Sequence, residues 1–167
     1  LIEQIDAEFH HHLQITEQLK GFNAVIATGS NNSARYFEHY FGKYPHIIRK
    51  NRSSVAILTG AETPAEIDLL GKDVFDYYGL GCRNVSKLMV PQNYHFPSLL
   101  NHLEHYAGIM QHHKYKNNYD YYRSVYLLNR QRHFASDFLI LLEKSAVVSM
   151  VSVVHYEFYA DENDLSK

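Results

Sequence analysis

The hydrophobic and polar positions in the first forty residues predict short elements that alternate in type. Loosely spaced apolar residues over Ile2–Leu19 predict a first helix. The mostly apolar run Phe22–Ala27 predicts a buried strand. A helix is expected next over Ala34–Phe41, because polar residues 31–33 are good helix caps and precede an apolar stretch.

The clearest helix signal begins at Thr63. This residue is a suitable N-cap, Pro64 takes the first helical position, and Glu66 completes a capping box three residues after the cap. The helix is expected to run to about Tyr78, where glycines follow. Its buried face would consist of Ile67, Leu70, Val74 and Phe75.

The rest of the chain extends the alternation of strands and helices. Further strands are expected at residues 47–48, 55–58, 85–90, 138–142 and 147–156, and helices at 96–111 and 119–129 with a polar loop between them. Strands that alternate with helices favour an α/β fold, with a mostly parallel sheet and flanking helices.

Composition and charge narrow the function classes. The 167 residues include 16 Lys and Arg against 18 Asp and Glu, so nothing in the net charge of −2 favours nucleic acid or an anionic membrane as a partner. No apolar run reaches the roughly 18 residues of a membrane span, and no signal peptide is visible. A single cysteine forms no internal disulfide, so a cytoplasmic location is expected. The chain starts at Leu1 and stops in a polar stretch, which suggests a partial chain.

Cys82 is the first candidate for chemistry. It follows the predicted helix within segment 79–84, GLGCRN. Glycine neighbours let a substrate approach the backbone closely, and a positive neighbour such as Arg83 favours the thiolate form of cysteine. The competing interpretation is a small buried apolar side chain without reactivity.

A second candidate is the turn Thr28-Gly29-Ser30. It follows a predicted strand and opens a predicted helix, where free backbone amides favour a phosphate group. One glycine is not a three-glycine dinucleotide fingerprint, so an ordinary strand-to-helix turn remains the alternative.

Other charged residues carry weaker signals. The basic run 49–52, RKNR, could bind phosphate or form a solvated loop. Twelve histidines invite a metal hypothesis, but the adjacent ones diverge around a helix, and His102 and His105 lack a matching set of carboxylate or cysteine ligands. We therefore expect no metal site. The tyrosines over 115–126 suggest a half-polar helical face, with base stacking the less favoured alternative.

In order and spacing, these pieces resemble the aldehyde dehydrogenase superfamily. Thr28–Ser30 is similar to its cofactor-side Thr-Gly-Ser turn, and Val55–Leu58 to the strand after its Glu-Leu-Gly-Gly-Lys segment. Gly79–Cys82, followed by Lys87 and Val90, resembles its Gly-Gln-x-Cys motif with a later basic residue and valine.

Within the superfamily, the stretch from Tyr78 to Pro91 looks most like the fatty acyl-CoA reductases that supply aldehyde to bacterial luciferase. The close resemblance covers Val25 to Pro91, about 40% of the chain. Residues 149–158 look only loosely like a later strand of the family, because the Phe-Gly-Pro-Val motif before that strand is not kept.

The resemblance implies a function and a division of the chain. Cys82 would be the nucleophile of an acyl-CoA reductase that forms a thioester and uses NADPH or NADH. Thr28, Gly29 and Ser30 would face the cofactor. Residues 1–45 would be the C-terminal end of a cofactor-binding domain, and residues 46–167 an incomplete catalytic domain. The upstream sheet and oxyanion-hole asparagine of the family would be missing, so activity of this chain alone is not expected.

One departure from the family pattern bears on the reaction. Where hydrolytic relatives carry the glutamate that activates water, this sequence has Arg49 or a neighbour, and no carboxylate lies between His46 and Gly60. Arginine does not take a proton from water at physiological pH. The acyl-enzyme is therefore expected to hydrolyse slowly.

Two alternatives stay open beside acyl-CoA reduction. The chain could belong to an acylating or ordinary aldehyde dehydrogenase that acts on a small aldehyde. It could also be a non-catalytic module that binds a nucleotide or a protein. The sequence does not fix the acyl chain length, the choice between NADH and NADPH, or whether the protein forms a homo-oligomer.

Overall fold

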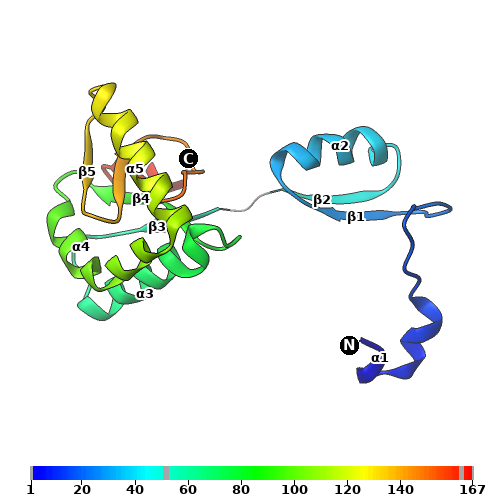
Figure 1. Cartoon of the computed structure of the whole chain (residues 1–167). Coiled ribbons are helices and arrows are strands. Elements are labelled where there is room, and N and C mark those ends of the chain that lie inside the picture. The colour runs from blue at the N-terminus through cyan, green and yellow to red at the C-terminus, as the bar shows by residue number, and fades with distance from the viewer. Residues whose placement is uncertain (1, 51–52, 162–163, 167) are drawn as a thin grey trace. The chain divides into compact units, whose positions relative to one another are not determined.

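The computed structural model describes residues 2–50, 53–161 and 164–166, and the chain divides into two compact units between residues 51 and 52. The first unit contains a two-stranded sheet, and the second a five-stranded sheet (Figure 1).

The first unit is a strand–helix–strand arrangement. Strand β1 (Val25–Thr28) and strand β2 (His46–Arg49) pair in parallel, and helix α2 (Asn31–Phe41) connects them and lies over them in Figure 1. The predicted strands and helix are confirmed within a few residues. The helix begins earlier than expected, because Ser30 is the N-cap and its hydroxyl accepts a hydrogen bond from the backbone of Ser33 at 3.0 Å.

The prediction of one helix over Ile2–Leu19 is wrong. The structure has a short helix α1 (Ile2–Ile5) and a 3-10 turn η1 (Ala7–His12), and residues 13–20 form no regular element. Ile5 and Ile15 are fully or largely exposed. Loose apolar spacing does not hold a long helix together when such apolar side chains are exposed, because helical stability comes mostly from packing of the apolar face.

The sheet of the second unit has the strand order β3-β4-β7-β6-β5. All neighbours are parallel except β5, which pairs antiparallel with β6 at one edge. The expected mostly parallel α/β sheet is therefore confirmed. The strands are β3 (Ser54–Ile57), β4 (Val85–Pro91), β5 (His133–Ala135), β6 (Ile140–Glu143) and β7 (Val153–Tyr159).

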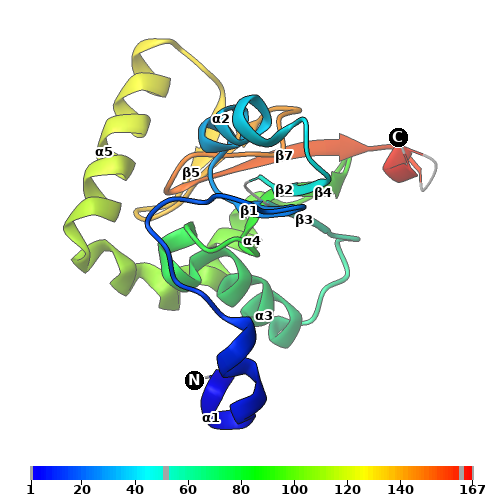
Figure 2. The ribbon, with the colours of Figure 1, turned by 90° about the vertical axis from the view of Figure 1, so that its right-hand side faces the viewer.

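Helices cover both faces of this sheet. Helix α3 (Pro64–Phe75), helix α4 (Phe96–His102) and the 3-10 helix η3 (Leu103–Gln111) pack on one face, and α3 and α4 lie below the strands in Figure 2. Helix α5 (His113–Leu128) packs against alternate residues of β6 and β7, which point to the other face. Because β6 is covered on both faces of the sheet, its first three residues are all apolar and buried.

Helix α3 begins as the sequence predicts and ends earlier. Thr63 and Glu66 form the capping box in both directions. The backbone N–H and the hydroxyl of Thr63 donate hydrogen bonds to the Glu66 carboxylate and lower the pKa of that carboxyl. The four residues expected on the buried face are buried. The helix stops at Phe75, because Tyr77 and Tyr78 adopt left-handed backbone angles within the 3-10 turn η2 (Asp76–Gly79).

Two other element boundaries differ from the prediction, and one strand is additional. The polar residues 113–118 belong to α5 rather than to a loop, because the ring of His112 caps the helix and Tyr115 is buried. Residues 147–152 are not strand, because the side chain of Ser86 binds the carbonyl of Val147 outside the ladder. The three-residue strand β5 was not expected.

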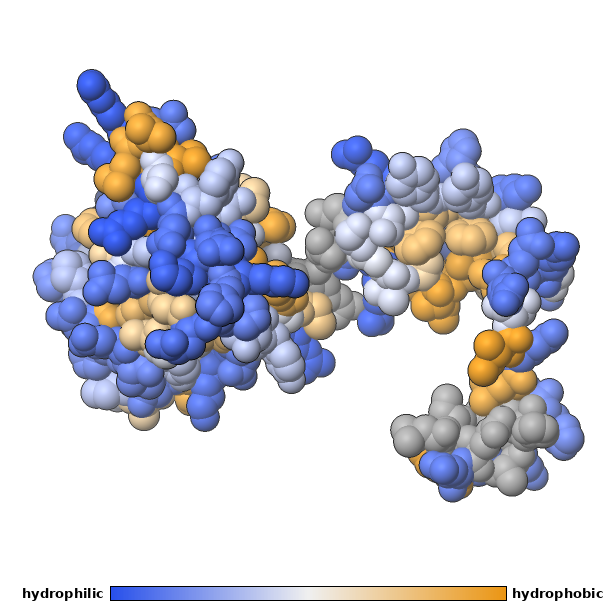
Figure 3. Space-filling model, viewed as in Figure 1, coloured by the Kyte–Doolittle hydropathy of each residue, from blue (hydrophilic) through white to orange (hydrophobic). Residues whose placement is uncertain are grey.

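Part of the surface of the second unit is apolar. Leu127 and Leu128 are exposed at the end of α5, where apolar atoms gather in Figure 3. Within the described residues, no helix is long and apolar enough to cross a membrane.

Candidate active site

Cys82 lies on the loop that joins η2 to β4, and its side chain is exposed. The loop lines a hollow of about 320 Å³ at the amino end of β4. Lys72, Asp73 and Asp76 come from the end of α3 and the start of η2, Tyr77 from η2, and Gly81 to Asn84 from the loop itself. The exposure contradicts the alternative of a buried structural cysteine.

The backbone before Cys82 is strained. Tyr77, Tyr78 and Gly79 follow one another with φ angles of 53°, 61° and 73°. A residue with a side chain loses about 1–2 kcal/mol in this left-handed conformation, and such outliers cluster at functional sites. The Tyr78 ring stacks on His112, with centroids 3.9 Å apart, and this contact supports the strained turn.

Asn84 supports the other side of the loop. Its side chain is buried and donates a hydrogen bond to the carbonyl of Asp73 at 2.7 Å, and its backbone N–H donates to the carbonyl of Gly81 at 3.1 Å. A side chain at Gly81 would have its Cβ 2.5 Å from Asn84 Oδ1. The glycine before the cysteine therefore lets the Asn84 side chain lie directly against the loop.

Lys87 does not line the hollow beside Cys82. Its ammonium is buried and donates to the carboxylate of Glu157 at 2.5 Å and to the carbonyl of Ser145 at 2.8 Å. The basic residue of the motif thus joins β4 to β7 and to the loop before β7. It stabilises the strand that follows Cys82.

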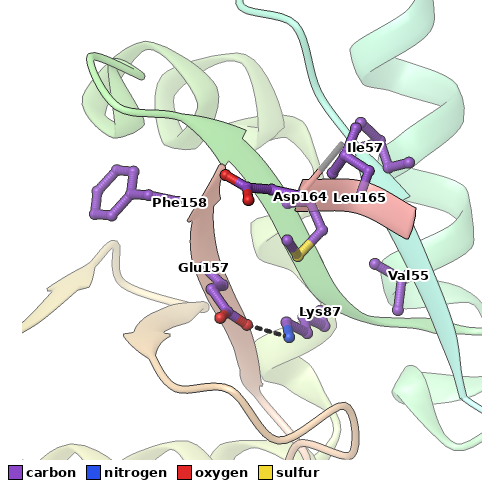
Figure 4. A pocket seen from close by; sticks show the side chains of 8 residues that line it. Val55, Ile57, Lys87, Glu157, Phe158, Asp164 and Leu165 are labelled. Atoms are coloured by element: carbon purple, nitrogen blue, oxygen red, sulfur yellow. Dashed lines mark hydrogen bonds and ion pairs between the residues drawn. The ribbon is translucent and has the colours of Figure 1, made fainter. Parts of the chain in front are cut away.

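A larger hollow of about 650 Å³ lies on the open part of the sheet over β3, β4 and β7 (Figure 4). Its walls combine apolar side chains, such as Val55 and Ile57, with the Lys87–Glu157 ion pair. Cys82 does not line this hollow, and Lys87 already has two partners there. We therefore assign the site around Cys82 to the smaller hollow.

The turn at residues 28–30 is regular and tightly packed. Thr28 ends β1, Gly29 makes the turn, and Ser30 caps α2. A Cβ at Gly29 would lie 2.9 Å from the Cβ of Ser33 and 3.1 Å from a ring carbon of Phe37. Glycine is required here because the turn lies directly against the helix.

Arg49 lies beside this turn. It pairs with Thr28 in the parallel register, and its carbonyl accepts a hydrogen bond from Gly29 at 3.1 Å. The edge therefore combines hydroxyl groups, the N-terminus of α2 and a guanidinium. All of these are suited to a phosphate.

The rest of the basic run is divided. Lys50 pairs with Glu38 of α2 at 2.9 Å, while Asn51 and Arg52 lie outside the described residues. Cys82 and the turn 28–30 lie in different units.

The histidines singled out above have structural contacts. His102 Nδ1 bonds the carbonyl of Ser98 at 2.8 Å, and His105 lies 3.5 Å from a carboxylate oxygen of Asp68. The described residues contain no group of three or more His, Cys, Asp and Glu side chains arranged to hold a metal ion.

Two residues of the site were not identified from the sequence. Asn84 belongs to the cysteine segment, but its residue type predicts no role there, and Tyr77 falls inside the predicted helix. A polar residue directly before an apolar strand could have indicated that Asn84 is buried. No sequence signal indicates left-handed angles at two successive tyrosines.

Comparison of folds connects these observations to known proteins. No protein-family model matches the sequence, and no curated protein matches it at a significant level. Among solved structures, indole-3-acetaldehyde dehydrogenase in complex with NAD+ matches 85% of this chain and 36% of its own, with a TM-score of 0.62 and 13% identity. The aldehyde dehydrogenase KauB from Pseudomonas aeruginosa gives the same coverages, a TM-score of 0.60 and 12% identity.

An aldehyde dehydrogenase from Bacillus cereus, in complex with NAD+, matches 86% of this chain and 36% of its own, with a TM-score of 0.59 and 12% identity. The chain thus spans little more than a third of the length of these enzymes. Over that part, the chain has the fold of the aldehyde dehydrogenases.

Proposed function

We propose that this chain is part of an NAD(P)H-dependent acyl-CoA reductase in which Cys82 carries the acyl group as a thioester. The observation that carries the proposal is the exposed thiol on a strained loop, at the rim of a hollow, within an aldehyde dehydrogenase fold. The first unit, up to residue 51, would form the end of a cofactor-binding domain, and the second unit the thiol-bearing part of the catalytic domain. The boundary expected from the sequence, after residue 45, lies just before β2, and β2 pairs with β1 in the first unit.

The residues of the first unit fit a nicotinamide dinucleotide. Helix α2 has no acidic residue in its first turn, and Ser30 and the hydroxyl of Thr28 lie at its start. Arg49 adds a positive charge at the neighbouring strand end. Amides, hydroxyls and a guanidinium are the donors that a pyrophosphate accepts. When bound, the reduced cofactor would supply a hydride.

Cys82 supplies the covalent step. Its thiolate attacks the carbonyl carbon of the acyl-CoA thioester, the bond from that carbon to the CoA sulfur breaks, and CoA leaves as a thiolate that takes up a proton. The acyl group is then held on Cys82 Sγ. After hydride transfer, the resulting thiohemiacetal collapses, releases aldehyde and restores the Cys82 thiolate.

The absence of a carboxylate in the sequence between His46 and Gly60 favours reduction over hydrolysis. Arg49 stands at or beside the position of the hydrolytic glutamate and does not accept a proton from water. Assisted proton transfer accelerates a step by about 10²–10⁴-fold. The acyl-enzyme should therefore persist long enough to be reduced.

The test uses the complete protein and octanoyl-CoA. Without reduced cofactor, mass spectrometry should find an octanoyl adduct on Cys82, and Cys82→Ser should abolish it. With reduced cofactor, a single turnover should release octanal with little octanoic acid. Normal reductase activity in Cys82→Ser would refute the assignment of the nucleophile.

Other outcomes of the same experiment identify the alternatives. Oxidation of a small aldehyde with NAD(P)+, without reaction with octanoyl-CoA, would indicate an ordinary aldehyde dehydrogenase. Octanoic acid as the main product would mean that another base is present. Neither acylation nor oxidation would favour a binding module that keeps the fold.

A further inference from the structure

Asn84 joins three parts of the second unit around Cys82. The side-chain amide donates to the carbonyl of Asp73 near the end of α3. The backbone N–H donates to the carbonyl of Gly81, and the backbone carbonyl accepts a hydrogen bond from Ser54 at 3.1 Å. Cys82 lies within the tight turn that the first backbone bond closes.

The side-chain oxygen of Asn84 is exceptional. It is the one buried side-chain nitrogen or oxygen atom without a hydrogen-bond partner in the part of the chain that the structure describes. Leaving a buried acceptor unpaired is unfavourable, so stability alone does not explain an asparagine at this position.

Gly81 completes the arrangement. Because glycine has no side chain, the oxygen of Asn84 fits beside the segment that carries Cys82, where a Cβ on residue 81 would come within 2.5 Å of it. The side chain of Asn84 therefore packs directly against the backbone of Gly81.

We propose that Asn84 is a positioning residue for Cys82, acting through Gly81. The inference rests on the proposed function, since it assigns Asn84 to the same thiol. Asn84 keeps the Gly81–Cys82 backbone in one position at the rim of the hollow. Accurate placement of a nucleophile matters because a displacement of about 1 Å can reduce the rate by about 10²-fold.

The experiment is a double-mutant cycle in the complete protein. The variants are Gly81→Ala, Asn84→Ala and the double variant, each measured for the rate of Cys82 acylation by octanoyl-CoA and of alkylation by iodoacetamide across a pH series. Asn118→Ala on α5 is the control, because that asparagine also donates to a helix carbonyl, at 2.7 Å, but does not line the hollow. Urea unfolding gives the folded fraction of each variant.

We expect each single variant to slow acylation by about 10–100-fold once corrected for the folded fraction, and to shift the pH profile of alkylation. The double variant should be no slower than the slower single variant, because residues in contact do not contribute independently. Asn118→Ala should leave both rates unchanged.

Other results would overturn the inference. If the folded variants keep wild-type rates, or if the two effects multiply, Asn84 has only a structural role or acts independently of Gly81. If Asn84→Ala does not fold, Asn84→Asp is measured in its place. Aspartate keeps the size of the side chain, but its carboxylate does not donate a hydrogen bond to the carbonyl of Asp73. If wild-type Cys82 is not acylated, the proposed function fails, while the alkylation profiles still decide whether Asn84 positions the thiol.

Discussion

Two turns carry the candidate chemistry of this chain, and they are built in opposite ways. The strand-to-helix turn at Thr28–Ser30 has a hydroxyl cap, a glycine where the backbone meets the helix, and ordinary angles. The helix-to-strand turn before Cys82 has two left-handed tyrosines and a buried oxygen without a partner. The first turn has fixed hydrogen-bond donors, whereas the second places the Cys82 loop directly after a strained stretch of backbone.

The largest expected effect concerns the tight packing of the regular turn. Gly29→Val should destabilise the first unit by about 1–3 kcal/mol, because its side chain would overlap Ser33 and Phe37. It should also raise the KM for NAD(P)H more than the KM for octanoyl-CoA. Steady-state kinetics and urea unfolding of the complete protein provide the measurement. Gly108→Val is the control, since nothing lies within 4 Å of a Cβ there; equal effects of the two variants would remove the packing argument.

The cap of α2 should matter somewhat less. Ser30→Ala removes the acceptor for the Ser33 backbone N–H and should cost about 0.5–2 kcal/mol. Cofactor affinity should fall as well if the helix start contacts it, and binding can be followed by cofactor fluorescence. Ser124→Ala serves as a comparison, because that hydroxyl only donates to a carbonyl within its own helix. An unchanged stability of Ser30→Ala would mean that the cap is replaceable by water.

In the strained turn before Cys82, glycine is expected to stabilise the fold relative to alanine. Glycine adopts left-handed angles freely, so Tyr77→Gly should be more stable than Tyr77→Ala by about 1 kcal/mol, even though glycine is more flexible in the unfolded chain. Comparing these two variants cancels the loss of the exposed ring. The free energies come from urea unfolding. A less stable glycine variant would show that the turn is not strained in solution.

The regular turn could be predicted from the sequence, whereas the strained turn could not. Caps and glycine turns are read from nearby residue types, so the Thr28–Ser30 turn and the start of α3 at Thr63 were identified correctly. The alternation of strands with helices likewise indicated the parallel sheet, because parallel neighbours need a crossover connection. The left-handed angles of Tyr78 and the burial of Asn84 depend on contacts with His112 and α3. Local pattern does not contain those contacts.

The smallest effect concerns pH. Burial, together with the positive charges of Lys144 and Lys87, lowers the pKa of His155 below its ordinary value of 6.5, while its ring nitrogen bonds the carbonyl of Ala146 at 2.7 Å. The unfolded chain therefore binds a proton that the folded chain resists. The contribution of His155 to the free energy of unfolding is fully present above pH 6.5. It is lost as the pH falls toward the pKa of His155 in the folded chain.

Replacing the ring tests this sign. His155→Gln should flatten the decline in stability below pH 6.5, as measured by urea unfolding at a series of pH values. His39→Gln, on the exposed surface of α2, provides the matched control. If His155→Gln keeps the full acid dependence, other groups cause it.

The ion pair between Lys87 and Glu157 has a consequence for the order of folding. Its partners are 70 residues apart, and the strands that carry them are direct neighbours in the sheet. Closing so long a loop is entropically costly, and such distant pairings slow folding. During synthesis, β4 has no β7 beside it until residues 153–159 have left the ribosome. Until then, β4, the strand that follows Cys82, has only β3 as a neighbour. We expect chaperones to recognise the nascent protein at this stage.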